Sequence, residues 1–188
     1  MNSTAVVKLG GSLLDFPQWP RQFQQFLLTY HRHCVIVVGG GRAANLIRDW
    51  QSTHGFDDAS AHELALHSML LNSRVVARIL NGRLVESLEA AEHCWQSDVL
   101  PVLDVVASLS REDTDESLPP DWNATSDSIA AFIAGQWQIQ HLALLKSVER
   151  TEGDSLETAA EKRLVDPLFP GLVRHYSLTV DWRNLRSE

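Results

Sequence analysis

The chain has 188 residues, 44% of them hydrophobic, which suits a single globular domain with a substantial core. Its formal net charge of -8 argues against a protein that coats nucleic acid, because the phosphates would be repelled unless basic residues gathered on one face, and no such gathering is visible. The 2 cysteines, Cys34 and Cys94, do not make a disulfide framework, so a reducing compartment, the cytoplasm, fits best. The sequence does not open with a basic segment followed by a long apolar run, so secretion is not predicted. No window approaches 18 uninterrupted apolar residues, so membrane spanning is not predicted either.

The first predicted element is a buried strand over residues 6–9, Val-Val-Lys-Leu, that runs directly into a glycine turn. Lys8 lies one residue before the end of this strand, and Gly10, Gly11 and Ser12 follow it. Glycines have no Cβ, so backbone N–H groups in the turn can approach an anion closely. The lysine and the turn together outline a phosphate site, although a lysine before a tight turn also occurs without any function.

A second strand and a second glycine turn follow a helix. Residues 21–30 carry apolar side chains at three- and four-residue spacing, which predicts a helix with one buried face. The run 34–38 is short and β-branched, as expected of a strand covered on both faces, and it ends at Gly39-Gly40-Gly41 before a predicted helix over 43–50. Two such units predict an α/β fold with a parallel sheet, in which both glycine turns open onto the same crevice.

The rest of the chain continues the alternation of helices and strands. Apolar periodicity marks the helices, and short apolar runs mark the strands. In chain order the predictions are a helix over 57–80, a helix over 88–96, a strand over 99–106, an exposed charged loop over 110–117, a helix that begins at 123–127, a strand over 142–145, a turn-rich connection over 164–171 and a short strand over 178–180. The polar segment 151–163 has no periodicity that fixes its structure.

Asp127 and Lys146 are further candidates for chemistry. Asp127 lies in the first turn of its predicted helix, where the helix macrodipole favours an anion, so helix capping alone would account for it. The functional alternative is that its carboxylate keeps Lys8 and Lys146 charged and aimed at a phosphate. A lone lysine at a strand end is usually just solvated, but Lys146 would share a sheet edge with Lys8.

Several other kinds of site are excluded. The sequence has no Gly-Lys pair and therefore no P-loop, and the second glycine turn lacks the third glycine of a dinucleotide fingerprint. No Gly-x-Ser-x-Gly turn marks a hydrolase. His62 and His67 are five residues apart, about 140° round a helix, whereas a zinc helix needs a spacing of four, so no metal site is predicted. Trp122 is a candidate wall of a substrate pocket.

These motifs resemble the amino acid kinase superfamily, whose members transfer the γ-phosphoryl group of ATP to a carboxylate or a phosphate. The resemblance rests on residues 7–13, residues 38–45 and the run 122–128, Trp-Asn-Ala-Thr-Ser-Asp-Ser. It implies a three-layer αβα sandwich with a mainly parallel central sheet, as a single domain over 1–188 with a shortened C-terminal nucleotide-binding part. Within the superfamily, these motifs and residues 62–69 look most like the kinases of methanofuran biosynthesis, which convert an aminomethylfuran-methyl phosphate to its diphosphate.

The resemblance implies a role for each matching residue. The catalytic residues would be Lys8, Lys146 and Asp127. Lys8 would contact the transferring phosphoryl group, and Asp127 would position the two lysines. Gly10, Gly11 and Ser12 would bind the phosphates of ATP. The acceptor would be held by Gly39, Gly40, Gly41, Asn45, Asn123 and Ser126. Mg²⁺ would be held mainly by the ATP oxygens, and a homo-oligomer is implied. Phosphoryl transfer needs in-line positioning and cations more than a covalent nucleophile, which suits these residues.

One segment departs from the family pattern. Family members place Thr-Asp-x-x-Gly after the strand over 142–145 to build the nucleotide site, whereas this chain reads Lys-Ser-Val-Glu-Arg at 146–150. Two hypotheses therefore stand. The first is a cytoplasmic ATP-dependent kinase for a small phosphorylated metabolite, with a furan-methyl phosphate as the preferred acceptor. The second is a non-catalytic protein that binds a small anionic metabolite or phosphate in the same glycine turns.

Overall fold

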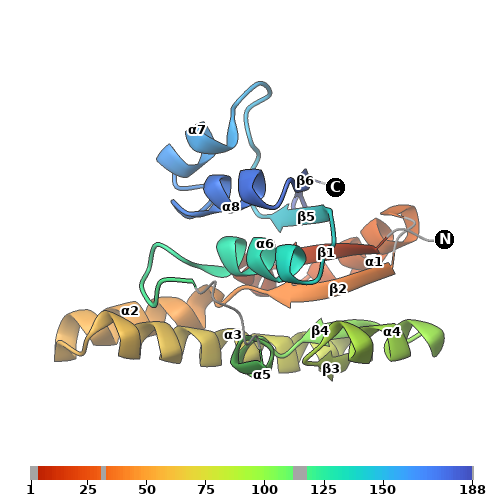
Figure 1. The fold of residues 1–188 in the computed structure, drawn as a ribbon, viewed down its shortest axis with the longest axis horizontal. Coiled ribbons are helices and arrows are strands. Elements are labelled where there is room, and N and C mark those ends of the chain that lie inside the picture. The colour runs from red at the N-terminus through yellow and green to blue at the C-terminus, as the bar shows by residue number, and fades with distance from the viewer. Residues whose placement is uncertain (1–3, 31–32, 112–117, 188) are drawn as a thin grey trace.

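The computed structural model describes residues 4–30, 33–111 and 118–187 and has an α/β fold built on one six-stranded sheet (Figure 1). The strand order is β3-β4-β2-β1-β5-β6. Every pairing between neighbouring strands is parallel. The predicted α/β class with a parallel central sheet is therefore confirmed.

Strands and helices alternate along the chain, as the two βα units at its start predicted. The strands are β1 (Thr4–Leu9), β2 (His33–Val38), β3 (Arg83–Val85), β4 (Pro101–Leu103), β5 (His141–Lys146) and β6 (Thr179–Asn184). The helices are α1 (Trp19–Tyr30), α2 (Gly41–His54), α3 (Asp58–Leu80), α4 (Leu88–Gln96), α5 (Val105–Arg111), α6 (Ser126–Gln136), α7 (Leu156–Glu161) and α8 (Phe169–His175). A 3₁₀ helix (Gly11–Asp15) follows β1.

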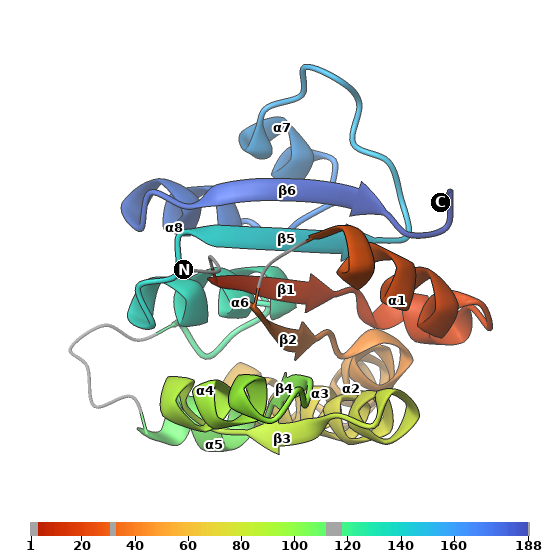
Figure 2. The same cartoon turned by 90° about the vertical axis from the view of Figure 1, so that its right-hand side faces the viewer.

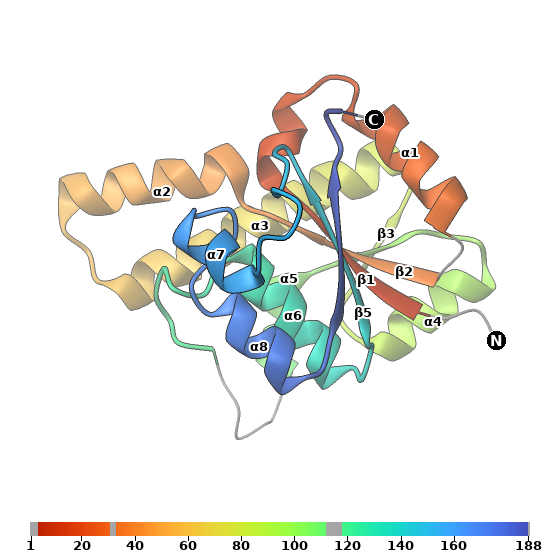
Figure 3. The ribbon, with the colours of Figure 1, turned by 90° about the horizontal axis from the view of Figure 1, so that it is seen from above.

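Successive side chains of the strands point to opposite faces and divide the core into two layers. Val6 and Leu144 belong to the layer that packs against α4, α5, α6 and α8. Val7 and Leu145 belong to the other layer, which packs against α1 and the second half of α3. Seen from above, α1 lies on one side of the sheet and α6 and α8 lie on the other (Figure 3). The expected three-layer αβα arrangement is confirmed.

The segment after β4 corrects a prediction. A strand was predicted over 99–106, but only Pro101–Leu103 is a strand, and Val105–Arg111 is helix α5. The carboxylate of Asp104 accepts a hydrogen bond from the Ala107 N–H (3.0 Å), so it caps a helix start that the β-branched valines disfavour. Residues 112–117 of the predicted loop lie outside the described part of the chain.

The C-terminal third is also more regular than predicted. Helix α7 forms within the polar segment 151–163, and α8 begins inside the predicted connection over 164–171, with Pro170 in its first turn. Proline fits the first turn of a helix because that position needs no N–H donor, so a signal for a turn was in fact a helix start. β6 is six residues long rather than three, and β3 was not predicted.

The strands all run in one direction, so their carboxyl ends meet at one edge of the sheet (Figure 2). Both glycine turns and Lys146 lie at this edge. Cys34 and Cys94 are buried thiols that do not form a disulfide with each other. Among the described residues, no helix is both long and apolar enough to cross a membrane.

Candidate active site

The two glycine turns touch each other at the carboxyl edge of the sheet. The Gly10 N–H extends the pairing of β1 with β5 by donating to the Leu145 carbonyl (2.8 Å). A Cβ on Gly11 would lie 2.2 Å from the Gly41 nitrogen, so only a hydrogen fits at this contact. Gly41 also has a φ of +53°, which glycine adopts without strain. The prediction that both turns share one crevice is confirmed.

Replacing Gly11 with alanine tests this contact. Its Cβ would meet the backbone of the second turn, which cannot rotate away as a flexible side chain does, so we expect a loss of about 3 kcal/mol in the free energy of unfolding. Gly171→Ala is the matched control, because a Cβ there has no atom within 4 Å. Urea denaturation of both variants measures the difference, and equal stabilities would show that the two turns are not in contact.

The side chain of Asn72 in α3 fixes the second glycine turn. Its Nδ2 donates to the carbonyls of Gly39 (2.7 Å) and Gly40 (2.8 Å). Gly40 precedes α2 and offers no side-chain cap, so the first N–H groups of α2 have no intrahelical partner and remain available to an anion. The Asn72 side chain thus fixes the position of both carbonyl groups in the turn that leads into α2.

Lys8, Asp127 and Lys146 form one buried cluster, here named the lysine cluster. Both lysines extend from the sheet face that carries Val6 and Leu144, because side chains alternate along β1 and β5. Helix α6 packs on this face with Asp127 in its first turn. Nζ of Lys8 lies 2.7 Å from one carboxylate oxygen of Asp127, and Nζ of Lys146 lies 2.8 Å from the other.

Burial and charge oppose each other in the lysine cluster. Lys8 and Asp127 are each 4% exposed. Burial alone raises the pKa of Asp127, but Lys8 and Lys146 outweigh it and hold that pKa below its usual range. Burial and the charge of Lys8 lower the pKa of Lys146 to about 8, although Asp127 pulls in the other direction. At neutral pH these three side chains therefore carry one excess positive charge, which suits a phosphate or phosphoryl group.

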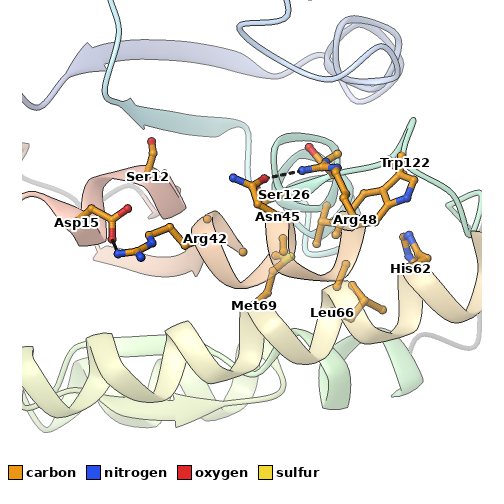
Figure 4. A pocket seen from close by; sticks show the side chains of 17 residues that line it. Ser12, Asp15, Arg42, Asn45, Arg48, His62, Leu66, Met69, Trp122 and Ser126 are labelled. Atoms are coloured by element: carbon orange, nitrogen blue, oxygen red, sulfur yellow. Dashed lines mark hydrogen bonds and ion pairs between the residues drawn. The ribbon is translucent and has the colours of Figure 1, made fainter. Parts of the chain in front are cut away.

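A cavity of about 300 Å³ adjoins the second glycine turn and the start of α6 (Figure 4). Leu66 and Met69 of α3 give it an apolar wall. Polar and charged side chains stand at its two ends, with Ser12, Asp15 and Arg42 at one end and Arg48, His62 and Trp122 at the other. This mixture is typical of a site for a small polar metabolite.

Arg48 is held in place at the end of the cavity formed with Trp122. Its guanidinium carbon lies 4.0 Å from the centroid of the Trp122 ring, and its Nη1 donates to the Asn45 side chain (3.0 Å). The indole N–H in turn donates to the Gln51 side chain (2.7 Å). A guanidinium over a ring can still donate from its other N–H groups, and its planar fork of donors suits a carboxylate or phosphate partner.

The predicted site residues gather at this edge with one exception. Ser12, Gly40, Gly41, Asn45 and Ser126 line the cavity, Gly10, Gly11 and Gly39 form the backbone behind it, and Lys8, Asp127 and Lys146 form the lysine cluster beside it. The exception is Asn123, which is exposed and does not line the cavity. Its Nδ2 donates to the carboxylate of Asp121 (3.1 Å). Trp122, suggested as a pocket wall, is one.

Three residues at this edge were not predicted. Asn72 had a usable signal, because it follows the buried Met69 by three residues and so lies on the inner side of its helix although it is polar. Arg48 follows Asn45 by three residues, so helical spacing places their side chains together. Asp166, which accepts hydrogen bonds from the start of α6, gave no signal because its partners lie about 40 residues earlier in the chain.

Across residues 4–30, 33–111 and 118–187, no group of three or more His, Cys, Asp and Glu side chains is arranged to hold a metal ion. Both oxygens of Asp127 are engaged by the lysines. Nδ1 of His62 lies 3.2 Å from the Asp121 carbonyl. The described side chains at this edge therefore offer cations and amides to a ligand rather than a set of metal ligands.

Two comparisons with known sequences identify a matching family and a related protein. The model of the amino acid kinase family matches residues 3–151. A curated protein, the 5-(aminomethyl)furan-3-yl-methyl phosphate kinase of Methanocaldococcus jannaschii, is 24% identical over 145 residues. That match covers 77% of this chain and 66% of the relative, slightly less than two thirds of its length.

Solved structures agree on the fold. The uridylate kinase of Archaeoglobus fulgidus superposes with a TM-score of 0.66 at 14% identity, over 97% of this chain and 92% of the other. The UMP kinase of Ureaplasma parvum superposes with a TM-score of 0.68 at 12% identity, over 99% of this chain and 91% of the other. The sheet topology and the two touching glycine turns are consistent with a family model that matches most of this chain. The chain therefore belongs to the amino acid kinase family.

Proposed function

We propose that this chain transfers the γ-phosphoryl group of ATP to a small phosphorylated metabolite bound in the cavity. The observation that carries the proposal is the lysine cluster, which lies where the two glycine turns touch. A donor phosphate on one turn and an acceptor on the other would meet beside Lys8 and Lys146. Kinase catalysis by positioning and cationic stabilisation needs such an arrangement.

The state of Asp127 supports a phosphate as the acceptor group. Both carboxylate oxygens are bound by ammonium groups, so Asp127 is not free to remove a proton from an acceptor hydroxyl. A phosphate monoester is largely doubly charged at neutral pH, because its second pKa is about 6. Such an acceptor attacks without a general base, so the lysine cluster has only to neutralise charge and hold the two groups in line.

On the donor side, we propose that Gly10, Gly11 and Ser12 contact the phosphates of ATP. Gly11 and Ser12 open the 3₁₀ helix, so their N–H groups lack intrahelical partners and can bind oxyanions. The hydroxyl of Ser12 lies 2.9 Å from the hydroxyl of Ser147, which brings the loop after β5 to the same place. Mg²⁺ would enter this site with the nucleotide, whose phosphate oxygens would hold it and whose charge it would neutralise. The carboxylate of the lysine cluster would not hold it, because both oxygens of Asp127 are bound by lysines.

On the acceptor side, we propose that Arg42, at the Ser12 end of the cavity, binds the phosphate of the metabolite, and that Arg48 and Trp122 at the other end contact the rest of the molecule. An aminomethylfuran-methyl phosphate is the preferred acceptor, by similarity to the curated relative. The cavity of about 300 Å³ is large enough for a small aromatic ring, and Trp122 and Met69 offer apolar surface to it. Trp122 and Arg48 would then select a flat ring, and Arg42 would select the phosphate that it bears.

The test is to incubate the purified protein with Mg-ATP and a panel of acceptors that includes phosphorylated and unphosphorylated furans and UMP. We expect ADP release with a phosphorylated acceptor and none with its unphosphorylated analogue. Arg48→Ala should raise the acceptor KM while leaving the KM for ATP unchanged, and Arg21→Ala on α1, away from the cavity, serves as the control. If calorimetry finds binding of an anionic metabolite but not of ATP, the non-catalytic alternative replaces the kinase.

The lysine cluster also predicts a pH dependence. Lys146 stabilises the transferring group only while protonated, and its pKa is about 8. We therefore expect kcat/KM, which reports the free enzyme, to be level between about pH 7 and pH 8, above the second pKa of the acceptor phosphate, and to fall about tenfold per pH unit well above pH 8. Asp127 should add no acidic limb near neutral pH because its pKa is lowered. A pH profile of kcat/KM with its alkaline midpoint near 10 instead would exclude Lys146 from this role.

We also propose that two copies pair through the exposed face of α3. Leu71 (56% exposed) is the centre of an apolar stripe that also contains Leu64, Val75 and Ile79. Antiparallel pairing about Leu71 would place Arg78 of one copy beside Glu63 of the other, which gives complementary charges. Light scattering should give twice the chain mass of 21.0 kDa, and Leu71→Glu should halve it. Leu28→Glu, at an isolated exposed leucine of α1, is the control.

A further inference from the structure

We propose that Asp166 is a positioning residue for phosphoryl transfer, which holds the first turn of α6 so that Asp127 and Ser126 face the reacting groups. The proposal rests on the proposed kinase function. Asp166 lies between α7 and α8, nearly 40 residues after the turn that it holds. It would link the C-terminal part of the chain to the catalytic edge.

The carboxylate of Asp166 is fully occupied by hydrogen bonds. Its Oδ2 accepts from the N–H (3.0 Å) and the hydroxyl (2.8 Å) of Thr125 and from the N–H of Ser128 (3.0 Å). Its Oδ1 accepts from the hydroxyl of Ser128 and from the N–H of Phe169 (3.1 Å). Four of these five donors belong to residues that flank Ser126 and Asp127, so the carboxylate clamps the turn from both sides.

Helix capping alone does not require this arrangement. Thr125 occupies the N-cap position of α6 and is itself a preferred capping residue, yet its side chain makes no capping bond to the helix. Its hydroxyl donates to Asp166 instead. A local threonine cap would serve an ordinary helix without burying a carboxylate, and Asp166 is only 6% exposed. The distant carboxylate therefore fixes the direction of the turn, beyond satisfying its N–H groups.

Asp166 also acts on the lysine cluster through its charge. Burial and the nearby charge of Asp127 raise the pKa of Asp166, while the Ser128 and Thr125 bonds oppose this. The groups that face Lys146 are Lys8 on β1, Asp127 on α6, Asp166 before α8, and the ring of Trp182 on β6, whose centroid lies 5.5 Å from Nζ. Arg150 lies over the same ring and adds positive charge. Among these, Asp166 is a second carboxylate that favours the charged form of Lys146.

The test compares Asp166→Asn with Ser128→Ala and with the control Asp154→Asn. Asparagine cannot accept on its amide nitrogen, so one side of the clamp is lost together with the charge. We expect kcat to fall about 10- to 100-fold, the range found for residues that orient the ligands of catalytic metals, with the KM for ATP unchanged. The alkaline limb of kcat/KM should also move to lower pH, because a charge that raises the pKa of Lys146 is gone.

Ser128→Ala separates the two effects. It removes one hydrogen bond and no charge, so we expect about a tenfold loss of kcat with the alkaline limb in its wild-type position. Asp154→Asn removes a carboxylate of the same C-terminal region, paired with Lys162 at 2.6 Å, and should change neither kcat nor the limb. Should Asp166→Asn not fold, Ser128→Ala decides the matter. A folded Ser128→Ala or Asp166→Asn protein with wild-type kcat overturns the proposal.

A readout without substrates distinguishes failure of this proposal from failure of the kinase function. The reactivity of Lys146 towards an amine-modifying reagent, followed by peptide mass spectrometry across pH, reports its titration in the free protein. Lys146 should titrate near pH 8 in the wild-type protein and in Ser128→Ala, and at lower pH in Asp166→Asn. If no acceptor is turned over, these midpoints still test the link from Asp166 to Lys146, and equal midpoints in all three proteins would sink it.

Discussion

Lys8→Ala is expected to lower kcat for phosphoryl transfer by about 10³-fold. The substitution removes a buried ammonium group that lies 2.7 Å from Asp127 at the contact between the glycine turns. Without it the lysine cluster holds one ammonium and one carboxylate, so no excess positive charge remains to stabilise the transferring group. ADP formation at saturating Mg-ATP and acceptor measures the effect.

The control for this prediction is Lys162→Ala. Lys162 is a half-exposed lysine that is also paired with an aspartate, Asp154, but it lies outside the catalytic edge. It should retain wild-type kcat. Circular dichroism of Lys8→Ala must show a folded protein for the comparison to count. A folded Lys8→Ala variant within tenfold of wild-type kcat would remove the lysine cluster from the mechanism.

Asp127→Asn is expected to reduce the free energy of unfolding by about 3–5 kcal/mol near neutral pH. The amide is the same size as the carboxylate but cannot balance the charges of Lys8 and Lys146, which then repel each other in a buried site. Loss of a proton from Lys146, whose pKa is already lowered to about 8, relieves that repulsion. The pKa of Lys146 should fall further in the variant, so the deficit relative to wild type should shrink as the pH rises towards 8 and stay at its smallest above that pH, where Lys146 is neutral in both proteins.

Urea denaturation at about pH 7 and about pH 9 measures both parts of this prediction. Asp181→Asn is the control, because Asp181 forms an exposed ion pair with Arg183 on β6 (3.1 Å). Exposed pairs contribute at most about 1 kcal/mol. A deficit for Asp127→Asn that is no larger than that of Asp181→Asn, or that does not change with pH, would show that the two lysines do not depend on this carboxylate.

Local sequence signals were enough to predict the first two strands and the glycine turns that follow them at the carboxyl edge of the sheet. The apolar runs of β1 and β2 are continuous because both faces of a central parallel strand are covered, and the glycines after them mark where the chain turns. The same signals failed at 99–106, where the β-branched Val105 and Val106 favoured a strand. There the Asp104 side chain caps a helix instead, which is a local hydrogen bond that propensity does not contain.

The sequence alone determined that a lysine precedes one glycine turn, that a second glycine turn follows the next strand, and that an aspartate starts a later helix. Tertiary structure decided that these parts meet. The register of β1 with β5 sets Lys8 near Lys146, and the packing of α6 over both strands places Asp127 between them. Asn72 and Asp166 likewise reach the site only through the packing of distant elements, where they bind Gly39 and Thr125. Spacing along the chain encodes which face a side chain takes, but a contact between residues far apart depends on how whole elements pack, and no local pattern specifies that.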